Sequence, residues 1–541
     1  MDQTKNGLKE VEDASNESVH KVEPVVVENG YDDEEGGRTD PSNRWLRTRK
    51  SDGDGRIDKR QKLEDNKDNR ALTPDGKPMF PEEKRLPKRK VACMIGYCGA
   101  GYHGMQINPL TKTIEGELFE AMVKAGAISM NNSNDLKKSG FMRAARTDKG
   151  VHAAGNMISL KMIIEDDGII DKINAELPEQ IRVWGFQRVN KSFDCRKMCS
   201  SRVYEYLMPT YSLLPPRLNS PLSKLVKEMQ RKYPDSTRTD PEGEKFWEEL
   251  TQKISDAGIS QFELDQINEA NREDIPLTIP LEIAARKVKD LSLEARQKFR
   301  VKQETLDALR KALSFYLGSH NFHNFTNGKP YRDPSAFRFM KDITISDPFV
   351  IGKTEWISIK IHGQSFMLHQ IRKMIGLASL VVRAGCPVEK VKEAFGPAKV
   401  NIPKAPALGL LLERPVYDGY NQKLKTYGHE PLNFDKYSEK MDAFKRKYIY
   451  SKIYEAEESE HTFHGFFGFI DFFTGNDSSN NGKPIFEFIT EGEVNKEGDV
   501  KEKKENPAAD NEAVEIKVAY PSVADEVADA TETAQTSPPA L

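Results

Sequence analysis

The chain has 541 residues, of which 37% are hydrophobic and 30% charged, so it can form more than one domain and contains globular parts diluted by polar segments. Its net charge of −3 is unevenly distributed: residues 1–83 hold 15 Lys and Arg against 21 Asp and Glu, and residues 491–541 hold 5 against 13. Residues 84–490 therefore carry about +11, which favours a polyanionic partner such as nucleic acid.

Cysteine content and hydropathy argue against two further classes of protein. Five cysteines in so long a chain are too few for a disulfide framework and indicate a reducing, intracellular compartment. No uninterrupted apolar stretch reaches the length of a membrane span, so no membrane partner is expected. Nothing in the composition defines the oligomeric state, and a monomer is favoured.

The two ends of the chain and the start of its basic part have distinct compositions. Residues 1–83 show no apolar period and are expected to form a disordered arm, and 491–541 a disordered acidic tail. KRLPKRK at 84–90 fits a nuclear localisation signal and, about equally well, a solvated basic run. Its position beside a disordered arm favours the nucleus, with allowance for a minor mitochondrial pool.

Residues 84–210 have the pattern of a first half-domain. Helical spacing is found at 113–127. Five segments have the alternation or β-branched composition of strands: 91–97, 141–145, 156–164, 181–189 and 201–209.

The remaining segments predict an insert, a second half-domain and an extension. Prolines and charge runs at 211–300 indicate a helical insert. Residues 301–425 again combine strands with helices, including a long apolar helix at 366–385. Residues 426–490 are expected to form a C-terminal helical extension. Two successive units of this kind predict an α+β fold in which related half-domains face each other.

GAGYHG at 99–104 matches the glycine spacing of a dinucleotide-binding loop. That motif should open a helix, whereas MQINPLTKT follows here, with a proline and no helical period. A glycine-rich turn beside the site is therefore favoured, and no nucleotide cofactor is expected. Cys93, Cys98, Cys195 and Cys199 lack the spacing of a zinc finger or ribbon, which favours buried thiols over a metal site.

The helix at 366–385 carries an arginine on its apolar stripe. Arg372 lies at helical spacing from Leu368 and Gly376. A buried guanidinium needs a carboxylate partner, because an unpaired buried charge is costly; the alternative is that Arg372 reaches to the surface.

AARTDKGVHA at 144–153 crowds Arg146, Asp148, Lys149 and His152 around a glycine. Taken alone, this is most simply an exposed turn. Together with a buried arginine and a tyrosine-bearing strand, it indicates a site that uses the ionised carboxylate of Asp148 in a cleft of low dielectric constant.

These residues resemble a known family. ARTDKGVHA at 145–153 is similar to the signature of TruA-type tRNA pseudouridine synthases, with Ala145 where the family has Gly. Five further segments resemble family motifs in family order: YCGAGYHGMQ (97–106), FDCRKMCSSRVYEY (193–206), GSHNFHNFT (318–326), SFMLHQIRKMIG (365–376) and APALGLLLE (405–413). The arms, insert and extension resemble the eukaryotic, fungal branch of the family.

The resemblance implies a fold and a set of roles. The fold is two ferredoxin-like (RRM-like) half-domains whose antiparallel sheets join around a central RNA-binding cleft. Asp148 is the implied catalytic aspartate, Arg372 its ion-pair partner, and Tyr204 the residue that stacks on the base and is a candidate proton acceptor. The other implied substrate contacts are Arg146, Lys149, His152, Arg196, Arg202 and Leu410.

The implied reaction is the isomerisation of uridine to pseudouridine without a cofactor. The target base is flipped into the cleft. Asp148 then promotes cleavage of the C1′–N1 bond, either by attack at C1′ or by removal of the C2′ proton. The resemblance implies tRNA as main substrate, chiefly in and around the anticodon stem, with U2 small nuclear RNA and messenger RNA as further substrates. It also raises a structural zinc ion. The competing hypotheses are a catalytically silent RNA-binding or chaperone protein on the same fold, and a hydrolase that uses Asp148 as nucleophile.

Overall fold

The computed structural model describes residues 86–108, 110–273, 275–472 and 483–490. The predictions for the arm at 1–83 and the tail at 491–541 lie outside these residues, as does the start of the basic cluster at 84–90. None of the helices in the described ranges combines the length and apolar character needed to cross a lipid bilayer.

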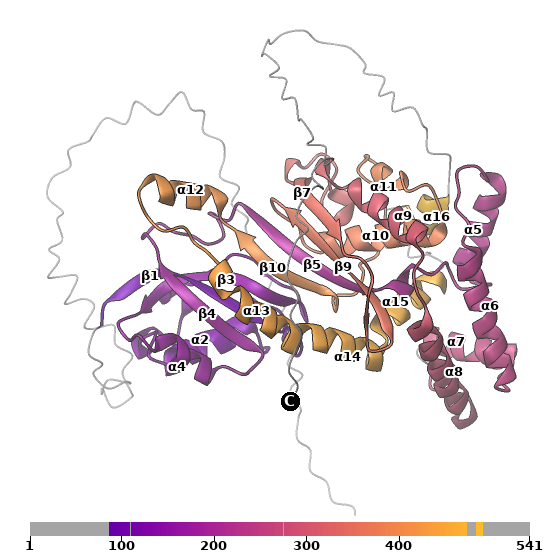
Figure 1. Cartoon of the computed structure of the whole chain (residues 1–541), viewed down its shortest axis with the longest axis horizontal. Coiled ribbons are helices and arrows are strands. Elements are labelled where there is room, and N and C mark those ends of the chain that lie inside the picture. The colour runs from indigo at the N-terminus through magenta and orange to yellow at the C-terminus, as the bar shows by residue number, and fades with distance from the viewer. Residues whose placement is uncertain (1–85, 109, 274, 473–482, 491–541) are drawn as a thin grey trace, which may run out of the picture. The chain divides into compact units, whose positions relative to one another are not determined.

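The described part is built on one continuous, mostly antiparallel sheet (Figure 1). Its strands run in the order β4-β1-β3-β10-β5-β9-β7-β6, with β2 paired to β3 and β8 to β9. The bounds are β1 Lys88–Tyr97, β2 Met142–Arg143, β3 His152–Ile163, β4 Ile181–Arg188, β5 Ser201–Pro209, β6 Gly318–Asn321, β7 Phe337–Ile345, β8 Phe349–Ile351, β9 Thr354–Gly363 and β10 Leu410–Val416. The β3–β10 pair is parallel and joins strands from distant parts of the chain. The fold is thus mixed α/β, with one large and mostly antiparallel sheet.

Helices cover the sheet next to the strands that they connect. The bounds are α2 Ile114–Lys124, α3 Leu136–Ser139, α4 Ile169–Glu176, α9 Gln303–Ser314, α10 Gln370–Ala384 and α11 Lys390–Glu393. In α4, the amide side chain of Asn174 exchanges two hydrogen bonds with the backbone of Val183 in β4. In α10, the hydroxyl of Ser379 lies 3.7 Å from the sulfur of Met208 in β5.

Helix α10 begins four residues later than the sequence predicts. The expected helix spans 366–385, but residues 364–369 form an irregular segment that ends at His369, whose φ of 62° is left-handed. Leu368 is 58% exposed in that segment. The predicted stripe of Leu368, Arg372 and Gly376 is therefore wrong for Leu368, which lies before the helix. The expected helix is too long because the apolar spacing continues into the residues that precede its first turn.

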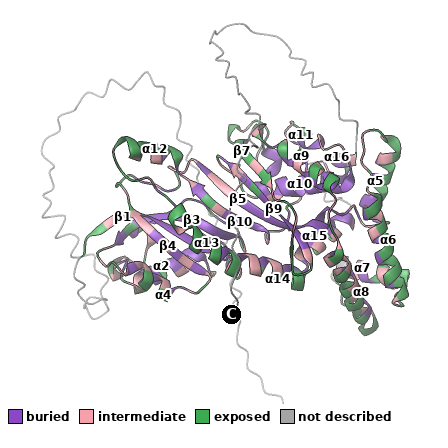
Figure 2. Ribbon diagram, in the orientation of Figure 1, coloured by how far each residue is buried: buried purple, intermediate pink, exposed green. Residues whose placement is uncertain are grey.

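Segment 211–300 contains α5 (Pro221–Lys232), α6 (Pro241–Asp256), α7 (Gln261–Glu273) and α8 (Ile279–Lys298). Ser220 and Asp240 cap α5 and α6 with side-chain oxygens, and each helix has proline at its start, which suits the fixed φ of that residue. Figure 1 shows these helices gathered beside the β9 end of the sheet, away from β1 and β4. Their outward faces are largely exposed (Figure 2).

The C-terminal helices do not lie on a single face of the sheet: residues 445–450 pack on the face opposite α10, whereas the last two helices contact α10. The C-terminal helices are α12 (Asp418–Thr426), α13 (Ser438–Phe444), a π-helical turn (Lys445–Tyr450), α14 (Ser451–Glu460), α15 (Thr462–Phe472) and α16 (Ile485–Thr490). Side chains alternate along β5, so Met208 faces α10 and Glu205 faces the other way. Glu205 there accepts a hydrogen bond from Tyr450 at 2.8 Å and pairs with Lys445 at 3.3 Å. The sheet is consequently buried on both faces at its centre (Figure 2).

Candidate active site

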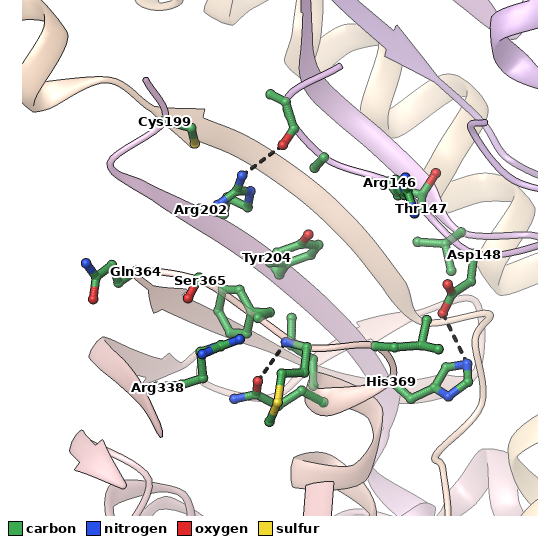
Figure 3. A pocket seen from close by; sticks show the side chains of 18 of the residues that line it. Arg146, Thr147, Asp148, Cys199, Arg202, Tyr204, Arg338, Gln364, Ser365 and His369 are labelled. Carbon is green, nitrogen blue, oxygen red and sulfur yellow. Dashed lines mark hydrogen bonds and ion pairs between the residues drawn. The ribbon is translucent and has the colours of Figure 1, made fainter. Parts of the chain in front are cut away.

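A cavity of about 890 Å³ lies over the join between β3, β10 and β5. Five parts of the chain line it: the loop between β2 and β3, the start of β5 with the residues before it, the start of β7, the irregular segment that leads into α10, and Leu410 at the start of β10. Figure 3 shows Asp148 and His369 at one end of the cavity, Tyr204 near its middle, and Arg202, Arg338 and Gln364 at the other end.

The loop that carries Asp148 is held by the glycine-rich turn at 99–104. A Cβ atom on Gly104 would lie 2.6 Å from the carbonyl oxygen of Thr147, and one on Gly99 would lie 2.2 Å from that of Val151. Only residues without a side chain allow this close approach between the two backbones. The glycine spacing that resembles a dinucleotide motif thus supports the Asp148 loop, because the two segments are packed together.

Buried hydrogen bonds fix the same loop from the core side. The hydroxyl groups of Tyr97 and Thr147 are 2.9 Å apart. Asn156 donates from Nδ2 to the carbonyl oxygen of Ala145 at 3.1 Å and to the Tyr97 hydroxyl at 3.3 Å. Because these groups are buried and mutually satisfied, they hold the residues on both sides of Arg146 in one conformation.

His369 is the ionisable partner of Asp148. Its Nε2 lies 3.7 Å from Asp148 Oδ2, and the side chains are 18% and 34% exposed. Burial lowers the pKa of His369, and the charge of Asp148 opposes that effect in part. A neutral imidazole at neutral pH can direct Nε2–H at the carboxylate. The left-handed backbone at His369 is uncommon for a residue with a side chain and aims the ring into the cavity.

Arg372 lies in the same cavity but makes a different contact from the predicted one. Its Nε donates to the carbonyl oxygen of Ala405 at 2.6 Å, and among the described residues no carboxylate lies within ion-pair distance of its guanidinium. Burial lowers the pKa of Arg372, while Asp148 raises it, so the two charges still interact across the cavity. The direct ion pair is absent because segment 403–405 packs against this side of α10, where a Cβ on Gly376 would be 2.4 Å from the Pro403 oxygen.

Tyr204 and Leu410 form an apolar part of the cavity wall. Tyr204 is 9% exposed, and its ring packs edge-on against Phe366 with centroids 5.1 Å apart. Burial raises the pKa of Tyr204 to about 12, so the phenol stays protonated at neutral pH. Leu410 is 7% exposed and begins β10 opposite Tyr206.

Most charged side chains in the wall are arginines. Asp148 is the only carboxylate among the described residues that line the cavity. The arginines are Arg143, Arg146, Arg196, Arg202, Arg338 and Arg372. Arg143 is paired with the buried Glu115, and Arg202 donates to the carbonyl oxygen of Ala144 at 2.8 Å. The result is a strongly cationic cavity with one anionic group.

Two of the predicted substrate contacts lie outside this wall. Lys149 is exposed and is not among the lining residues. His152 is a correction: it is 1% exposed in the core, its Nδ1 accepts a hydrogen bond from the Gly99 amide at 3.1 Å, and burial lowers its pKa to about 4. It points inward because it begins β3, where the strand enters the sheet between β1 and β10.

His369, Phe366 and Arg338 are site residues that the sequence did not single out. His369 and Phe366 lie inside the motif SFMLHQIRKMIG, where helical spacing of apolar residues indicates Arg372 alone. Arg338 carries no local signal, because it reaches the cavity only through the pairing of β7 with β9.

The cysteines do not form a metal site. All five are free, and Cys199 is the one that is not buried. Within the described ranges, no group of three or more His, Cys, Asp or Glu side chains is arranged to hold a metal ion. The donors present do not fit the structural zinc ion that the family resemblance raises.

Comparison with known proteins gives the family. Residues 312–418 match a family model described as tRNA pseudouridine synthase. A tRNA pseudouridine synthase 1 of Saccharomyces cerevisiae is 55% identical over 398 residues, covering 73% of this chain and 72% of that protein. The protein of that name in Schizosaccharomyces pombe is 41% identical over 486 residues, covering 78% and 90%. A tRNA pseudouridine(27/28) synthase of S. cerevisiae is 42% identical over 370 residues, covering 67% and 94%.

The class follows from these matches: the protein is a pseudouridine synthase, which is an isomerase. Within that class, the chain belongs to the TruA-type tRNA pseudouridine synthase family, alongside fungal enzymes.

Proposed function

We propose that this protein converts uridine to pseudouridine in tRNA, chiefly in and around the anticodon stem, and also in U2 small nuclear RNA and messenger RNA. The observation that carries the proposal is that Asp148, at one end of the cavity, is the single carboxylate among its described lining residues, while six arginines supply most of the other charge. Such a cavity attracts a polyanion and offers it one reactive group. The relative whose name specifies positions 27/28 supports the choice of the anticodon stem.

The proposed mechanism assigns a step to each part of the wall. The target uridine leaves its stack, and Arg146, which is exposed beside Asp148, holds the displaced strand. The uracil enters between Tyr204 and Leu410, and Tyr204 stacks on it. Asp148 either attacks C1′ or removes the C2′ proton, and the C1′–N1 bond breaks. The uracil then rotates and C5 bonds to C1′, while the Asp148–C1′ bond breaks on the first route or Asp148 returns the proton to C2′ on the second. Loss of the C5 proton completes pseudouridine. Tyr204 is protonated at rest, so it can accept that proton only after passing on its own, and a water molecule is the other acceptor.

Arg372 and the remaining cations have supporting roles in this scheme. Arg372 stabilises the ionised form of Asp148 through the cavity, or pairs with it directly once RNA displaces the Ala405 contact. Arg196 and Arg202 contact the RNA in the cavity, and Lys149 contacts phosphate outside it.

For the architecture, we propose two ferredoxin-like half-domains that meet at the cavity. In support, β1-α2-β2-β3-α4-β4 and β5-α9-β7-β9-α10-β10 both follow the order strand, helix, strand, strand, helix, strand. Both also have the spatial order fourth, first, third, second strand. In this scheme β5 belongs to the second unit, and the insert at 211–300 follows its first strand. The expected boundary at 210 then moves to about 200.

We further propose that catalysis needs no cofactor, that the protein acts as a monomer, and that the basic cluster at 84–90 directs it to the nucleus. A tagged protein with the five lysines and arginines of KRLPKRK changed to glutamine should then lose nuclear enrichment.

The test of the activity is release of the C5 hydrogen from a tRNA transcript labelled at C5 of uridine. Wild-type protein should release label and form pseudouridine, and Asp148→Asn, which keeps the shape of the side chain, should lose at least a thousandfold in rate. Equal release by both proteins would remove the role of Asp148. Binding without release by wild type would favour the non-catalytic RNA-binding protein, and free uracil on chromatography would favour the hydrolase.

A further inference from the structure

The far end of the cavity has features of a second nucleotide site. Figure 3 shows Arg202, Arg338 and Gln364 together at this end, across Tyr204 from Asp148. A volume of about 890 Å³ lies in the upper part of the range for sites that enclose a whole small ligand. One flipped uridine beside Asp148 therefore leaves this end of the cavity open.

The sheet register builds this end from three neighbouring strands. Arg202 in β5 is opposite Gly363 in β9, and Gly363 is opposite Met340 in β7. The amide of Gln364 donates to the carbonyl oxygen of Phe339 at 2.9 Å, which places Gln364 beside Arg338. A Cβ on Gly363 would lie 2.7 Å from the Phe366 ring, so the glycine allows that ring to fold over the strand. The side chains at this end thus rise from a rigid surface.

Arg338 is partly desolvated, and the carboxylate of Asp333 compensates its charge only in part and from beyond ion-pair distance. Burial lowers the pKa of its guanidinium. Its Nε is buried without a hydrogen-bond partner, and its Nη1 donates only to the carbonyl oxygen of its own neighbour Phe337, at 2.8 Å. In the part of the chain that the structure describes, no carboxylate pairs with it. A half-buried guanidinium with a free donor is suited to a phosphate or to the edge of a base.

The positive charge of the cavity wall also exceeds the negative charge that one nucleotide supplies. Apart from Arg143, the cavity arginines have no carboxylate within ion-pair distance in the described ranges. A single flipped nucleotide brings the two phosphates that flank it. Five arginines around the cavity therefore match a longer stretch of backbone.

We propose that Arg202, Arg338 and Gln364 form a subsite for a nucleotide adjacent to the target uridine. Arg202 and Arg338 bind its phosphate, and the side-chain amide of Gln364, which is exposed, hydrogen-bonds the edge of its base. The subsite makes recognition depend on a neighbour as well as on the flipped base. This inference rests on the proposed function of the same cavity.

The first experiment measures coupling between Gln364 and the neighbouring base. The substrates are synthetic stem–loop RNAs with one target uridine, in which the nucleotide on its 5′ or its 3′ side is intact or abasic. For wild type, one abasic position should lower kcat/KM by about five- to a hundredfold. On the intact RNA, Gln364→Ala should lower kcat/KM by a similar factor relative to wild type. On the RNA with that abasic position, kcat/KM of Gln364→Ala should fall little further. Equal losses for Gln364→Ala and wild type at both positions would overturn the contact.

The second experiment tests Arg338. Arg338→Gln should raise KM with little change in kcat, and should reduce the slope of log affinity against log salt by about one. Arg338→Lys should restore the salt slope but not the full affinity, because lysine lacks the planar donor pair. Arg286→Gln, which removes an exposed arginine from α8, is the matched control and should leave both unchanged.

The outcomes separate this inference from the proposed function. If wild type forms no pseudouridine on any substrate, the proposed function fails. If wild type is active, abasic neighbours on both sides cost nothing, and Arg338→Gln behaves as Arg286→Gln does, then the subsite alone is refuted.

Discussion

At the scale of single residues, Asp148 owes its environment to side chains from distant parts of the chain. Nε2 of His369 lies 3.7 Å from its carboxylate. Arg372 donates a hydrogen bond to the carbonyl oxygen of Ala405 and interacts with the Asp148 charge at longer range. Neither contact can be read from spacing along the sequence. Arg372 lies in the cavity, as its position on an apolar helix predicts, because an apolar helix is a sequence property. Its direct partner differs from the predicted carboxylate because a backbone carbonyl can also satisfy a guanidinium.

His369 is expected to position Asp148. His369→Ala removes the Nε2 contact and places a residue that disfavours left-handed backbone at φ 62°, so kcat should fall by roughly ten- to a hundredfold. His369→Asn tolerates that backbone and retains an N–H donor, and should recover a large part of the rate. Steady-state turnover on a stem–loop RNA measures both variants. Similar rates for alanine and wild type would show that Asp148 needs no such partner.

Arg372→Leu should lower turnover more than RNA affinity. The substitution removes the cation that favours ionised Asp148 and leaves the Ala405 oxygen without its donor. We expect kcat to drop by at least a hundredfold, with Kd changed less than tenfold, and Arg372→Lys to recover part of kcat. Single-turnover rates and filter binding provide the two numbers. A larger loss in affinity than in rate would instead make Arg372 a phosphate contact.

At the scale of elements, a glycine-rich turn and a loop act as one unit. The turn at 99–104 follows β1 and supports the Asp148 loop through two close backbone approaches. The sequence correctly indicates a turn and excludes a helix here, since proline and polar residues follow the glycines. Why the glycines are needed could not be predicted, because their partners lie about fifty residues further along the chain.

Gly104→Ala and Gly101→Ala form a matched pair that isolates this packing. Both glycines have positive φ, 92° and 82°, so both substitutions strain the backbone. A Cβ on Gly104 would also be 2.6 Å from the Thr147 oxygen, whereas one on Gly101 meets nothing within 4 Å. Gly101→Ala should cost about 1 kcal/mol of unfolding free energy, and Gly104→Ala roughly 2–4 kcal/mol together with a loss of turnover. Urea unfolding and kcat measure these effects; equal behaviour would contradict the close approach.

At the scale of the whole molecule, buried polar groups join the C-terminal helices to the rest of the fold. Arg383 in α10 donates from Nη2 to both carboxylate oxygens of Asp471 in α15, at 2.8 and 2.9 Å, and both side chains are 2% exposed. Burial lowers the pKa of His461 to about 4 and that of His464 well below its usual value. These histidines, like His152, are neutral in the folded protein.

Acid should therefore destabilise the fold before most carboxylates titrate. The unfolded imidazole has a pKa near 6.5, while that of folded His152 is about 4, so the unfolded chain binds more protons between these values. The stabilisation is complete above about pH 6.5 and is lost as the pH falls toward 4. His152 alone should contribute about 2 kcal/mol between pH 7.5 and pH 5.

Urea unfolding at the two pH values measures this dependence. His152→Asn should remove the His152 contribution of about 2 kcal/mol and leave the part that His461 and His464 supply, and replacement of the exposed His103 by glutamine should leave the dependence unchanged. An unaltered pH dependence in His152→Asn would show that the imidazole is not buried in its neutral form.

The sequence by itself determined the helical insert pattern, the strands around the Asp148 loop, the family motifs and the residue type at each position of the candidate site. These are local properties, set by apolar period, turn chemistry and short motifs. The tertiary structure decided the rest. It brought His369, Arg338 and Gln364 to the cavity, turned His152 into the core, and gave Arg372 a carbonyl partner. Those outcomes depend on which strands pair and which segments pack closely, and they involve residues separated by tens to hundreds of positions, whose proximity no local pattern records.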